Sequence, residues 1–184
     1  MLRERILELA KEEKMTHVGS YLSAVDIIDE IYTFKNENEP FILSSGHAFL
    51  AQQVVMEKHG IPIGATPTHP ESRMNGVEVS TGSLGQGLPI AVGMALANRM
   101  RRVWCLISDG ECAEGSIWEA LRIADEQRLE NLKVYVNSNG WSAYGEVDQD
   151  KLEARLKAFF PVRFRRTNSD FGDIKGLDAH YKPL

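Results

Sequence analysis

The sequence has few of the features that mark secreted, membrane-spanning or nucleic-acid-binding proteins. It contains only two cysteines, Cys105 and Cys112, which are too few for a disulfide framework. No apolar run approaches the roughly 20 residues that a membrane-spanning helix needs. The first residues, 1–14, read as a charged amphipathic helix rather than a secretory signal. The net charge of −5 gives no general attraction to nucleic acid or anionic membranes, so we expect a cytoplasmic protein that binds neither.

Internal repeats and low-complexity linkers are also missing from the sequence. The length of 184 residues and the apolar share of 43% are those of a globular protein with one respectable core. We therefore expect residues 1–184 to form a single domain.

The spacing of apolar residues predicts helices that alternate with short strands. Ser23 and Asp26 form a capping-box pattern at the start of one of these helices. Residues 60–84 are rich in Gly, Pro, Thr and Ser and predict a long irregular loop, which in a compact domain is usually functional. The predicted helices are 1–14, 23–34, 46–58, 88–100 and 114–128, and the predicted strands are 41–43, 103–107 and 132–136.

The segment 103–136 reads as strand, helix, strand, with both strands apolar throughout. Such strands are typical of a parallel sheet that is covered on both faces, so we predict an α/β fold with a parallel sheet flanked by helices. Ligands of these sheets bind beyond the carboxyl ends of the strands. The polar segments SDG, 108–110, and NSN, 137–139, follow the two strands and are expected to be neighbours there.

Asp109 and Asn139 are the candidate metal ligands of this rim. Their side-chain oxygens, with a backbone carbonyl from the following turn, make a hard-oxygen set suited to Mg²⁺ or Ca²⁺. Gly110 lets the backbone pass close to a ligand, and the helix behind it directs its N–H groups to the same place. A diphosphate bridged to the rim by Mg²⁺ fits these features. The alternative is that Asp-Gly and Asn-Gly are ordinary turn dipeptides, and the two interpretations are evenly balanced.

A glycine-rich segment and three histidines extend the candidate site. TGSLGQG, 81–87, leads into an apolar helix, and its glycines allow close approach of a cofactor or of another helix. His17, His47 and His69 lie in loops or at helix starts beside small residues, which favours a pocket that binds an anion and moves protons. A zinc site is the weaker alternative, because the spacings match no compact ligand pattern.

Taken in order, several segments resemble the N-terminal, diphosphate-binding half of transketolases, which depend on thiamine diphosphate. These segments span residues 15–148 and include HVGSYLS, FILSSGHA, THPE, VEVSTGSLGQGLPIAVGMALA, SDGECAEG and VNSNG. The thiamine motif of the wider superfamily is Gly-Asp-Gly followed about thirty residues later by Asn, and here Asp109 and Asn139 are 30 positions apart. LSSGHA, HPE and TGSLGQG narrow the resemblance to the transketolase branch. The fold implied is the diphosphate-binding module of thiamine enzymes.

The resemblance implies which residues hold the cofactor and its metal. Asp109, Asn139 and the backbone carbonyl of Trp141 would bind Mg²⁺, or Ca²⁺ in its place, and Asn139 would also belong to the cofactor site. Gly110 and His47 would contact the diphosphate.

Other matching residues would serve the ring of the cofactor and the substrate. Gly82 and Leu84 would line the thiazolium and aminopyrimidine region. His17 and His69 match histidines that point at the sugar and handle its hydroxyl protons, so they are catalytic candidates. Glu114 matches an acid at the contact between subunits that takes part in a carboxylate relay, although a first-turn helix acid favoured by the dipole is the other interpretation.

The activity implied is transfer of a two-carbon ketol unit from a ketose to an aldose, with thiamine diphosphate supplying the carbanion chemistry. Two alternatives stay open. One is a subunit of another thiamine diphosphate enzyme, of the 2-oxoacid decarboxylase or synthase type. The other is a degenerate, non-catalytic scaffold of the same fold.

The sequence departs from the family pattern in three places. Ser108 replaces the first glycine of Gly-Asp-Gly, where a hydroxymethyl group would crowd the diphosphate or donate to it. Family members continue beyond the segment GLDAHYKPL with a Lys- and Gly-rich segment and another histidine near the diphosphate, and we find no match to either. The pyrimidine-binding domain, which carries the glutamate that activates the cofactor, is also absent.

The missing domain predicts a split enzyme. We expect this chain to be inactive alone and to pair with a C-terminal transketolase-like subunit that carries the pyrimidine domain, as a two-plus-two heterotetramer. The expected substrate is a sugar or sugar phosphate.

Overall fold

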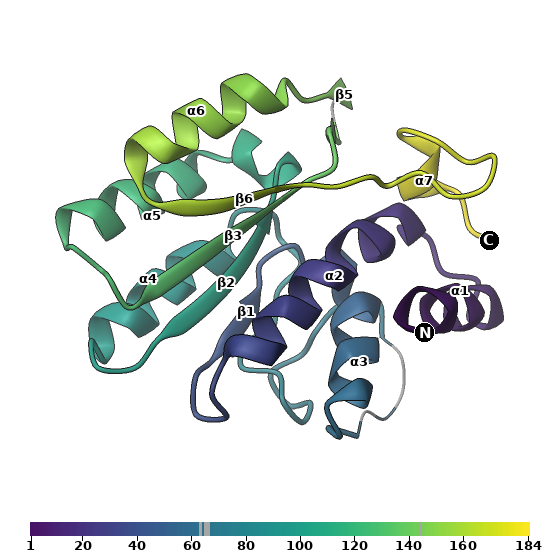
Figure 1. Cartoon of the computed structure of the whole chain (residues 1–184), viewed down its shortest axis with the longest axis horizontal. Helices are drawn as coiled ribbons and strands as arrows, with labels where there is room; N and C mark the ends of the chain where they lie inside the picture. Colours follow the sequence, from purple (N-terminus) through teal and green to yellow (C-terminus); the bar gives the residue numbers. More distant parts are fainter. Residues whose placement is uncertain (63, 65–66, 144) are drawn as a thin grey trace.

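The computed structural model describes residues 1–62, 64, 67–143 and 145–184. Within them, a parallel sheet of four strands in the order β1-β2-β3-β6 runs through the molecule (Figure 1). The strands are β1 (Phe41–Leu43), β2 (Val103–Ser108), β3 (Leu132–Ser138) and β6 (Val162–Arg166). A short antiparallel ribbon of β4 (Trp141–Ser142) and β5 (Gly145–Glu146) follows β3.

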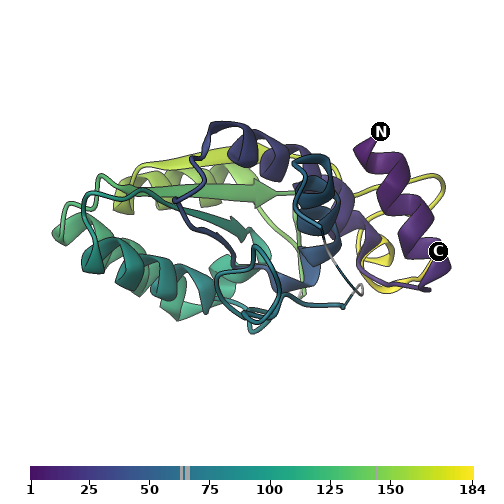
Figure 2. The same cartoon turned by 90° about the horizontal axis from the view of Figure 1, so that it is seen from below.

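Helices cover both faces of the sheet, which Figure 2 shows from below. One layer contains α1 (Leu2–Glu12), α2 (Val18–Phe34) and α3 (Phe49–Lys58), and the other contains α4 (Gly87–Ala97), α5 (Gly115–Glu126) and α6 (Gln149–Phe159). Three short helices, η1 (Gly46–Ala48), η2 (Gly110–Ala113) and α7 (Asp178–Tyr181), lie in connections or near the chain end.

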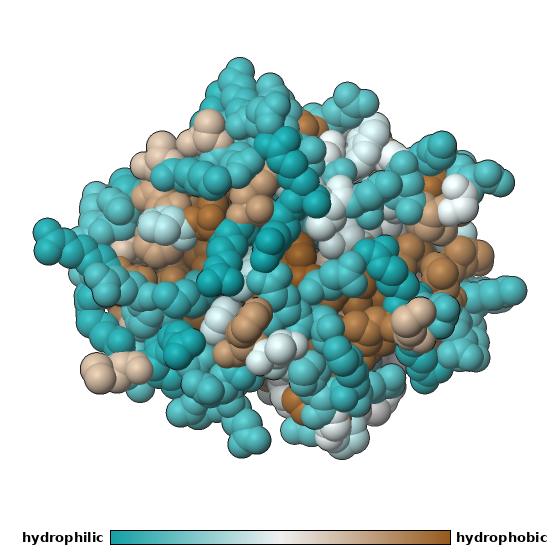
Figure 3. All heavy atoms as spheres, viewed as in Figure 1, coloured by the Kyte–Doolittle hydropathy of each residue, from teal (hydrophilic) through white to brown (hydrophobic). Residues whose placement is uncertain are grey.

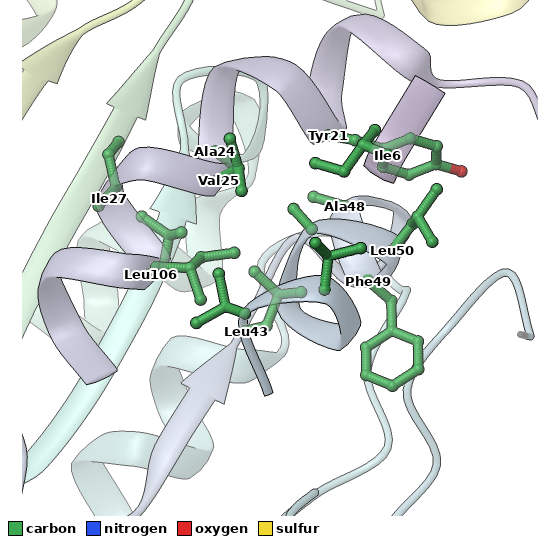
Figure 4. Packing of buried hydrophobic residues seen from close by; sticks show 14 of the residues in the cluster. Ile6, Tyr21, Ala24, Val25, Ile27, Leu43, Ala48, Phe49, Leu50 and Leu106 are labelled. Carbon is green, nitrogen blue, oxygen red and sulfur yellow. The ribbon is translucent and has the colours of Figure 1, made fainter. Parts of the chain in front are cut away.

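The strands divide their side chains between two apolar clusters because successive residues of a strand point to opposite faces. Leu43, Leu106 and Tyr135 pack toward α1, α2 and α3, whereas Ile42 and Cys105 pack toward the other layer. Figure 4 shows the first cluster, in which side chains of α1, α2 and α3 meet those of β1 and β2. The core therefore lies on both sides of the sheet, and the strand ends are left to carry polar groups.

The prediction of a parallel sheet flanked by helices is confirmed. The predicted strands and the five predicted helices are present, and 60–84 contains no helix or strand among its described residues. The predicted start of one helix is wrong, because α2 begins at Val18 rather than at Ser23. Ser23 is buried inside α2, where its hydroxyl donates to the carbonyl of Ser20 at 3.1 Å and accepts from the side chain of Asn137 at 3.0 Å.

Two further features were not predicted. α6 and β6 extend the strand-helix-strand unit by one step, so β3 is an inner strand and β6 is an edge. The predicted helix 88–100 is apolar, yet the outer side of α4 is open, and Pro89, Gly93, Leu96 and Ala97 are exposed there.

None of the helices in the described part of the chain is long and apolar enough to cross a membrane. The face shown in Figure 3 is mostly hydrophilic, with smaller apolar patches between the polar side chains.

Candidate active site

A pocket of about 250 Å³ lies at the carboxyl end of the sheet. Its walls come from the start of α2, from η1, from the glycine-rich segment before α4, from the turns after β2 and β3, and from α7. Nine of the ten residues predicted for the site line this pocket: His17, His47, His69, Gly82, Leu84, Asp109, Gly110, Asn139 and Trp141.

Asp109 is a buried acid directly after β2, and neighbouring turns hold its carboxylate. Its Oδ1 accepts the N–H of Gly110 at 3.0 Å, and its Oδ2 accepts the hydroxyl of Ser138 at 3.1 Å and the N–H of Gly140 at 2.7 Å. Burial raises the pKa of Asp109 to about 6, and these hydrogen bonds offset burial only in part. Within the described residues no cationic side chain pairs with Asp109, so its charge is left uncompensated.

Asn139 follows β3 and reaches the same part of the pocket. The bond from Gly140 to Asp109 brings the turn of Asn139 against the turn of Asp109. The Oδ1 of Asn139 accepts the N–H of Trp141 at 3.0 Å. A β-carbon built on Gly110 would lie 3.7 Å from the carbonyl oxygen of Trp141, so this carbonyl also lies beside the turn of Asp109.

The oxygen atoms around these two turns fit a divalent cation that also binds a phosphate. Each oxygen of a carboxylate can accept two hydrogen bonds, and Oδ1 of Asp109 accepts one in the described part of the structure. One carboxylate, one amide and one carbonyl leave room for the phosphate oxygens and waters that Mg²⁺ commonly keeps. A cluster of three or more His, Cys, Asp or Glu side chains arranged for a metal does not occur among the described residues. A cation here would therefore depend on Asp109 as its one charged protein ligand.

Gly82 lies in another part of the pocket wall. Its φ of +147° is in the region that favours glycine, and a β-carbon there would lie 2.6 Å from the ring of His69. The small size of Gly82 thus lets His69 lie in the pocket wall. The Nδ1 of His69 lies 3.1 Å from the hydroxyl oxygen of Thr68.

His17 and His47 lie together in the pocket, with ring centroids 5.2 Å apart. Burial, with smaller contributions from the charges of His17, His180 and His69, lowers the pKa of His47 to about 3. Burial, followed by the charge of His69, also lowers the pKa of His17. Both imidazoles are therefore neutral at pH 7, where each can donate one hydrogen bond and accept another.

His180 is a fourth pocket histidine that the sequence analysis missed. Its Nδ1 lies 2.8 Å from the hydroxyl oxygen of Ser20, and its backbone carbonyl accepts the N–H of His17 at 2.9 Å. Burial, followed by the charge of His17, lowers the pKa of His180 to about 4. His180 lies within GLDAHYKPL, a segment to which the sequence analysis assigned no site residue. The available signal was the setting of His180 beside a small residue, as for the other three.

Glu114 and Ser108 have positions that the sequence did not specify. Glu114 does not line the pocket; it is the N-cap residue of α5, where its N–H donates to the carbonyl of Glu111 at 2.9 Å. Ser108 does line the pocket, and its hydroxyl oxygen accepts the N–H of Glu111 at 3.3 Å. The serine that replaces the family glycine therefore caps the first turn of η2.

Comparison with known families gives one match that spans most of the chain. Residues 6–175 match the family described as transketolase, thiamine diphosphate binding domain.

Curated relatives include both separate subunits and complete enzymes. The chain is 30% identical over 210 residues to one subunit of the apulose-4-phosphate transketolase of Phocaeicola vulgatus, covering 88% of this chain and 75% of that protein. It is 30% identical to the 6-deoxy-6-sulfo-D-fructose transketolase subunit SqwG of a Clostridium species, covering 86% and 69%. Human transketolase is 37% identical over 139 residues, covering 66% of this chain and 22% of that protein.

Solved transketolases share the fold. A transketolase mutant from Pichia stipitis in complex with fructose 6-phosphate superposes with a TM-score of 0.75 at 20% identity, covering 100% of this chain and 39% of that chain. The transketolase of Leishmania mexicana gives a TM-score of 0.62 at 22% identity, covering 88% and 36%. The chain thus spans less than two-fifths of these solved proteins.

Proposed function

Because this chain belongs to the transketolase family, through the domain of those enzymes that binds thiamine diphosphate, we propose that it is the diphosphate-binding subunit of a two-chain ketol transferase. The observation that carries the proposal is the convergence of the Asp109 and Asn139 turns on one pocket at the carboxyl end of the sheet. Thiamine diphosphate would supply the nucleophilic carbon and the electron sink for a two-carbon fragment.

The residues of the rim would bind the diphosphate through a metal. Asp109, Asn139 and the carbonyl of Trp141 would hold Mg²⁺, or Ca²⁺ in its place. The uncompensated charge of Asp109 supports this role, since a cation would neutralise it. Gly110 and His47 would contact the diphosphate, where a neutral imidazole can donate one hydrogen bond.

The remaining pocket residues would serve the organic part of the cofactor and the substrate. Gly82 and Leu84 would line the thiazolium and aminopyrimidine region. His17 and His69 would exchange protons with the hydroxyl groups of a sugar or sugar phosphate. The lowered pKa of His17 supports a role as proton acceptor at neutral pH, because its imidazole is then unprotonated.

The second chain would be a C-terminal transketolase-like subunit with the pyrimidine domain and the activating glutamate, in a two-plus-two assembly. Relatives named as subunits support a divided enzyme. Glu114 would lie at the contact between subunits, which fits its position outside the pocket lining. The names of the relatives, with apulose 4-phosphate and a sulfo-fructose, favour ketol transfer on a sugar over 2-oxoacid decarboxylation.

Reconstitution of activity tests the proposal. The purified chain, the candidate partner and their mixture are each assayed for ketol transfer with thiamine diphosphate and Mg²⁺. We expect transfer only with the mixture and only with both cofactors. Transfer by this chain alone would refute the divided enzyme, and a mixture that binds no thiamine diphosphate would refute the cofactor assignment.

A further inference from the structure

Glu111 is a fully buried acid that lies outside the pocket lining, next to the turn that bears Asp109. Its relative exposure is 0% and, within the described residues, no cationic side chain pairs with it. A buried carboxylate is costly unless hydrogen bonds satisfy it. The partners that satisfy Glu111 come from three separate parts of the chain.

The carboxylate of Glu111 accepts hydrogen bonds from three segments of the chain. Its Oε1 accepts the hydroxyl of Ser44, at the end of β1, at 2.6 Å and the N–H of Gly85, in the glycine-rich segment, at 2.9 Å. Its Oε2 accepts the N–H of Ser108, at the end of β2, at 3.0 Å. These partners lie 67, 26 and 3 positions away from Glu111 in the sequence.

A second set of bonds fixes the ends of the glycine-rich segment to the same place. The hydroxyl oxygen of Ser44 accepts the N–H of Gly87, at the start of α4, at 3.1 Å. The hydroxyl of Thr81 donates to the carbonyl of Leu43, the last residue of β1, at 2.6 Å. The carbonyl of Gly85 accepts the hydroxyl of Ser116, in the first turn of α5, at 2.8 Å. Glu111 thus holds the middle of a segment whose two ends are tied to β1.

The two segments that Glu111 joins both contribute to the lining of the candidate cofactor pocket. Gly82 and Leu84 line one wall, and Ser108, Asp109 and Gly110 line the other. A single carboxylate bonds to both walls through Gly85 and Ser108. Their separation therefore depends on one side chain that does not itself touch the pocket.

We propose that Glu111 is a positioning residue, whose carboxylate fixes the glycine-rich segment against the turn of Asp109 and so sets the fit of the pocket for its cofactor. The identity of that cofactor rests on the proposed function. Glutamine has the same shape but presents an amide N–H₂ where Ser108 or Gly85 donates, so one bond between the walls would be lost.

The test compares two buried glutamates in the full 184-residue chain. Glu111→Gln is matched with Glu39→Gln, because Glu39 is also buried but lies at the other end of the sheet, bonded to Trp104 and Asn36. Thiamine diphosphate is titrated calorimetrically with Mg²⁺ in excess, and unfolding midpoints are measured for each variant. Loss of one bond to a charged group predicts binding about tenfold or more weaker in Glu111→Gln and within about twofold of wild type in Glu39→Gln.

Amide hydrogen exchange without any cofactor gives a second readout. We expect faster exchange at the N–H groups of Gly85 and Ser108 in Glu111→Gln, with exchange in β3 unchanged. If Glu111→Gln fails to fold, Glu111→Asp keeps the charge and shortens the reach, and the same two amides should exchange faster.

The outcomes separate this proposal from the proposed function. Unchanged exchange at Gly85 and Ser108 would overturn the positioning role whether or not the chain binds thiamine diphosphate. Equal loss of affinity in both variants would also overturn it, because Glu111 would then act only through overall stability. A wild-type chain that binds no cofactor either alone or with its partner subunit would refute the function, and the exchange measurement would still decide the role of Glu111.

Discussion

The two ends of the central sheet both bury acids, but they satisfy them differently. At the amino end, Glu39 accepts the indole N–H of Trp104 at 2.7 Å and two N–H groups of Asn36, and the guanidinium of Arg102 lies 3.3 Å away. At the carboxyl end, the described partners of Asp109 are neutral donors. Glu39 is paired with a cation of the chain itself, and among the described residues Asp109 is not.

The pKa values of these acids follow the same division. Burial raises the pKa of Glu39, but the bonds from Trp104 and Asn36 and the charge of Arg102 outweigh it, so the net pKa is lowered. Burial dominates at Asp109 and raises its pKa to about 6. The contrast teaches that Asp109, which lines the pocket, has no cationic partner among the described residues, and under the proposed function Mg²⁺ with a diphosphate would supply that cation.

Removing the carboxylate of Asp109 should have the largest effect on cofactor binding. Asp109→Ala removes the one charged ligand of the proposed metal site, and we expect Mg²⁺-dependent affinity for thiamine diphosphate to fall by about 100-fold or more, the size of a lost interaction with a charged group. Calorimetric titration with and without EDTA measures this. Asp125→Ala, an exposed acid on α5, is the control and should bind as wild type. Unchanged affinity in Asp109→Ala would favour the degenerate scaffold.

Removing the carboxylate of Glu39 should instead lower the stability of the fold. Glu39→Ala leaves the buried indole N–H of Trp104 without its acceptor, and we expect a loss of about 2–3 kcal/mol in the free energy of unfolding. Denaturant unfolding measures it, with Glu37→Ala, an exposed neighbour, as control. Cofactor affinity of the folded protein should not change. A loss of affinity without a loss of stability would contradict the division between the two ends.

Two glycines of α4 allow a test of close packing at the carboxyl end. A β-carbon on Gly87 would lie 2.6 Å from the Cα of Ser44, so Gly87→Ala should cost roughly 1–3 kcal/mol of stability and weaken cofactor binding. A β-carbon on Gly93 would meet nothing within 4 Å, so Gly93→Ala should stabilise the helix by about 0.5–1 kcal/mol. Similar thermal midpoints for both variants would show that the contact with Ser44 is unimportant.

The raised pKa of Asp109 predicts a pH dependence for binding. A metal must displace the proton below about pH 6, so Mg²⁺-dependent affinity should fall about tenfold per pH unit there and level off above pH 7. Without metal the sign is opposite: the contribution of Asp109 to stability is greatest below its ordinary pKa and declines as the pH rises through about 6. Affinity that is flat between pH 5 and 7 would contradict the shift.

Sequence patterns were sufficient to predict the site residues that directly follow the strands of the sheet. Asp109 and Asn139 follow apolar strands, and the carboxyl ends of parallel strands lie at one edge of a sheet, so the pattern itself predicts that they are neighbours. The histidines and the glycine-rich segment were identified from their settings in loops and at helix starts, and the resemblance to transketolases then implied their roles. His17, His47, His69, Gly82 and Leu84 line one pocket in the structure.

Contacts between distant parts of the chain could not be predicted in this way. His180 meets Ser20 across 160 positions, and Glu111 meets Ser44 across 67 positions. The start of α2 was misplaced for a similar reason. Ser23 has the pattern of a helix cap, but it lies inside α2, where its hydroxyl accepts a hydrogen bond from the distant Asn137.

The position of the metal tests the central claim most directly. Crystals of this chain, alone or with its partner subunit, would be grown with thiamine diphosphate and Mn²⁺ in place of Mg²⁺, and anomalous scattering would locate the ion. We expect one peak at bonding distance, about 2.1 Å, from the side-chain oxygens of both Asp109 and Asn139 and from the diphosphate. A peak that contacts neither side chain, or a bound cofactor without any ion at this rim, would contradict the account.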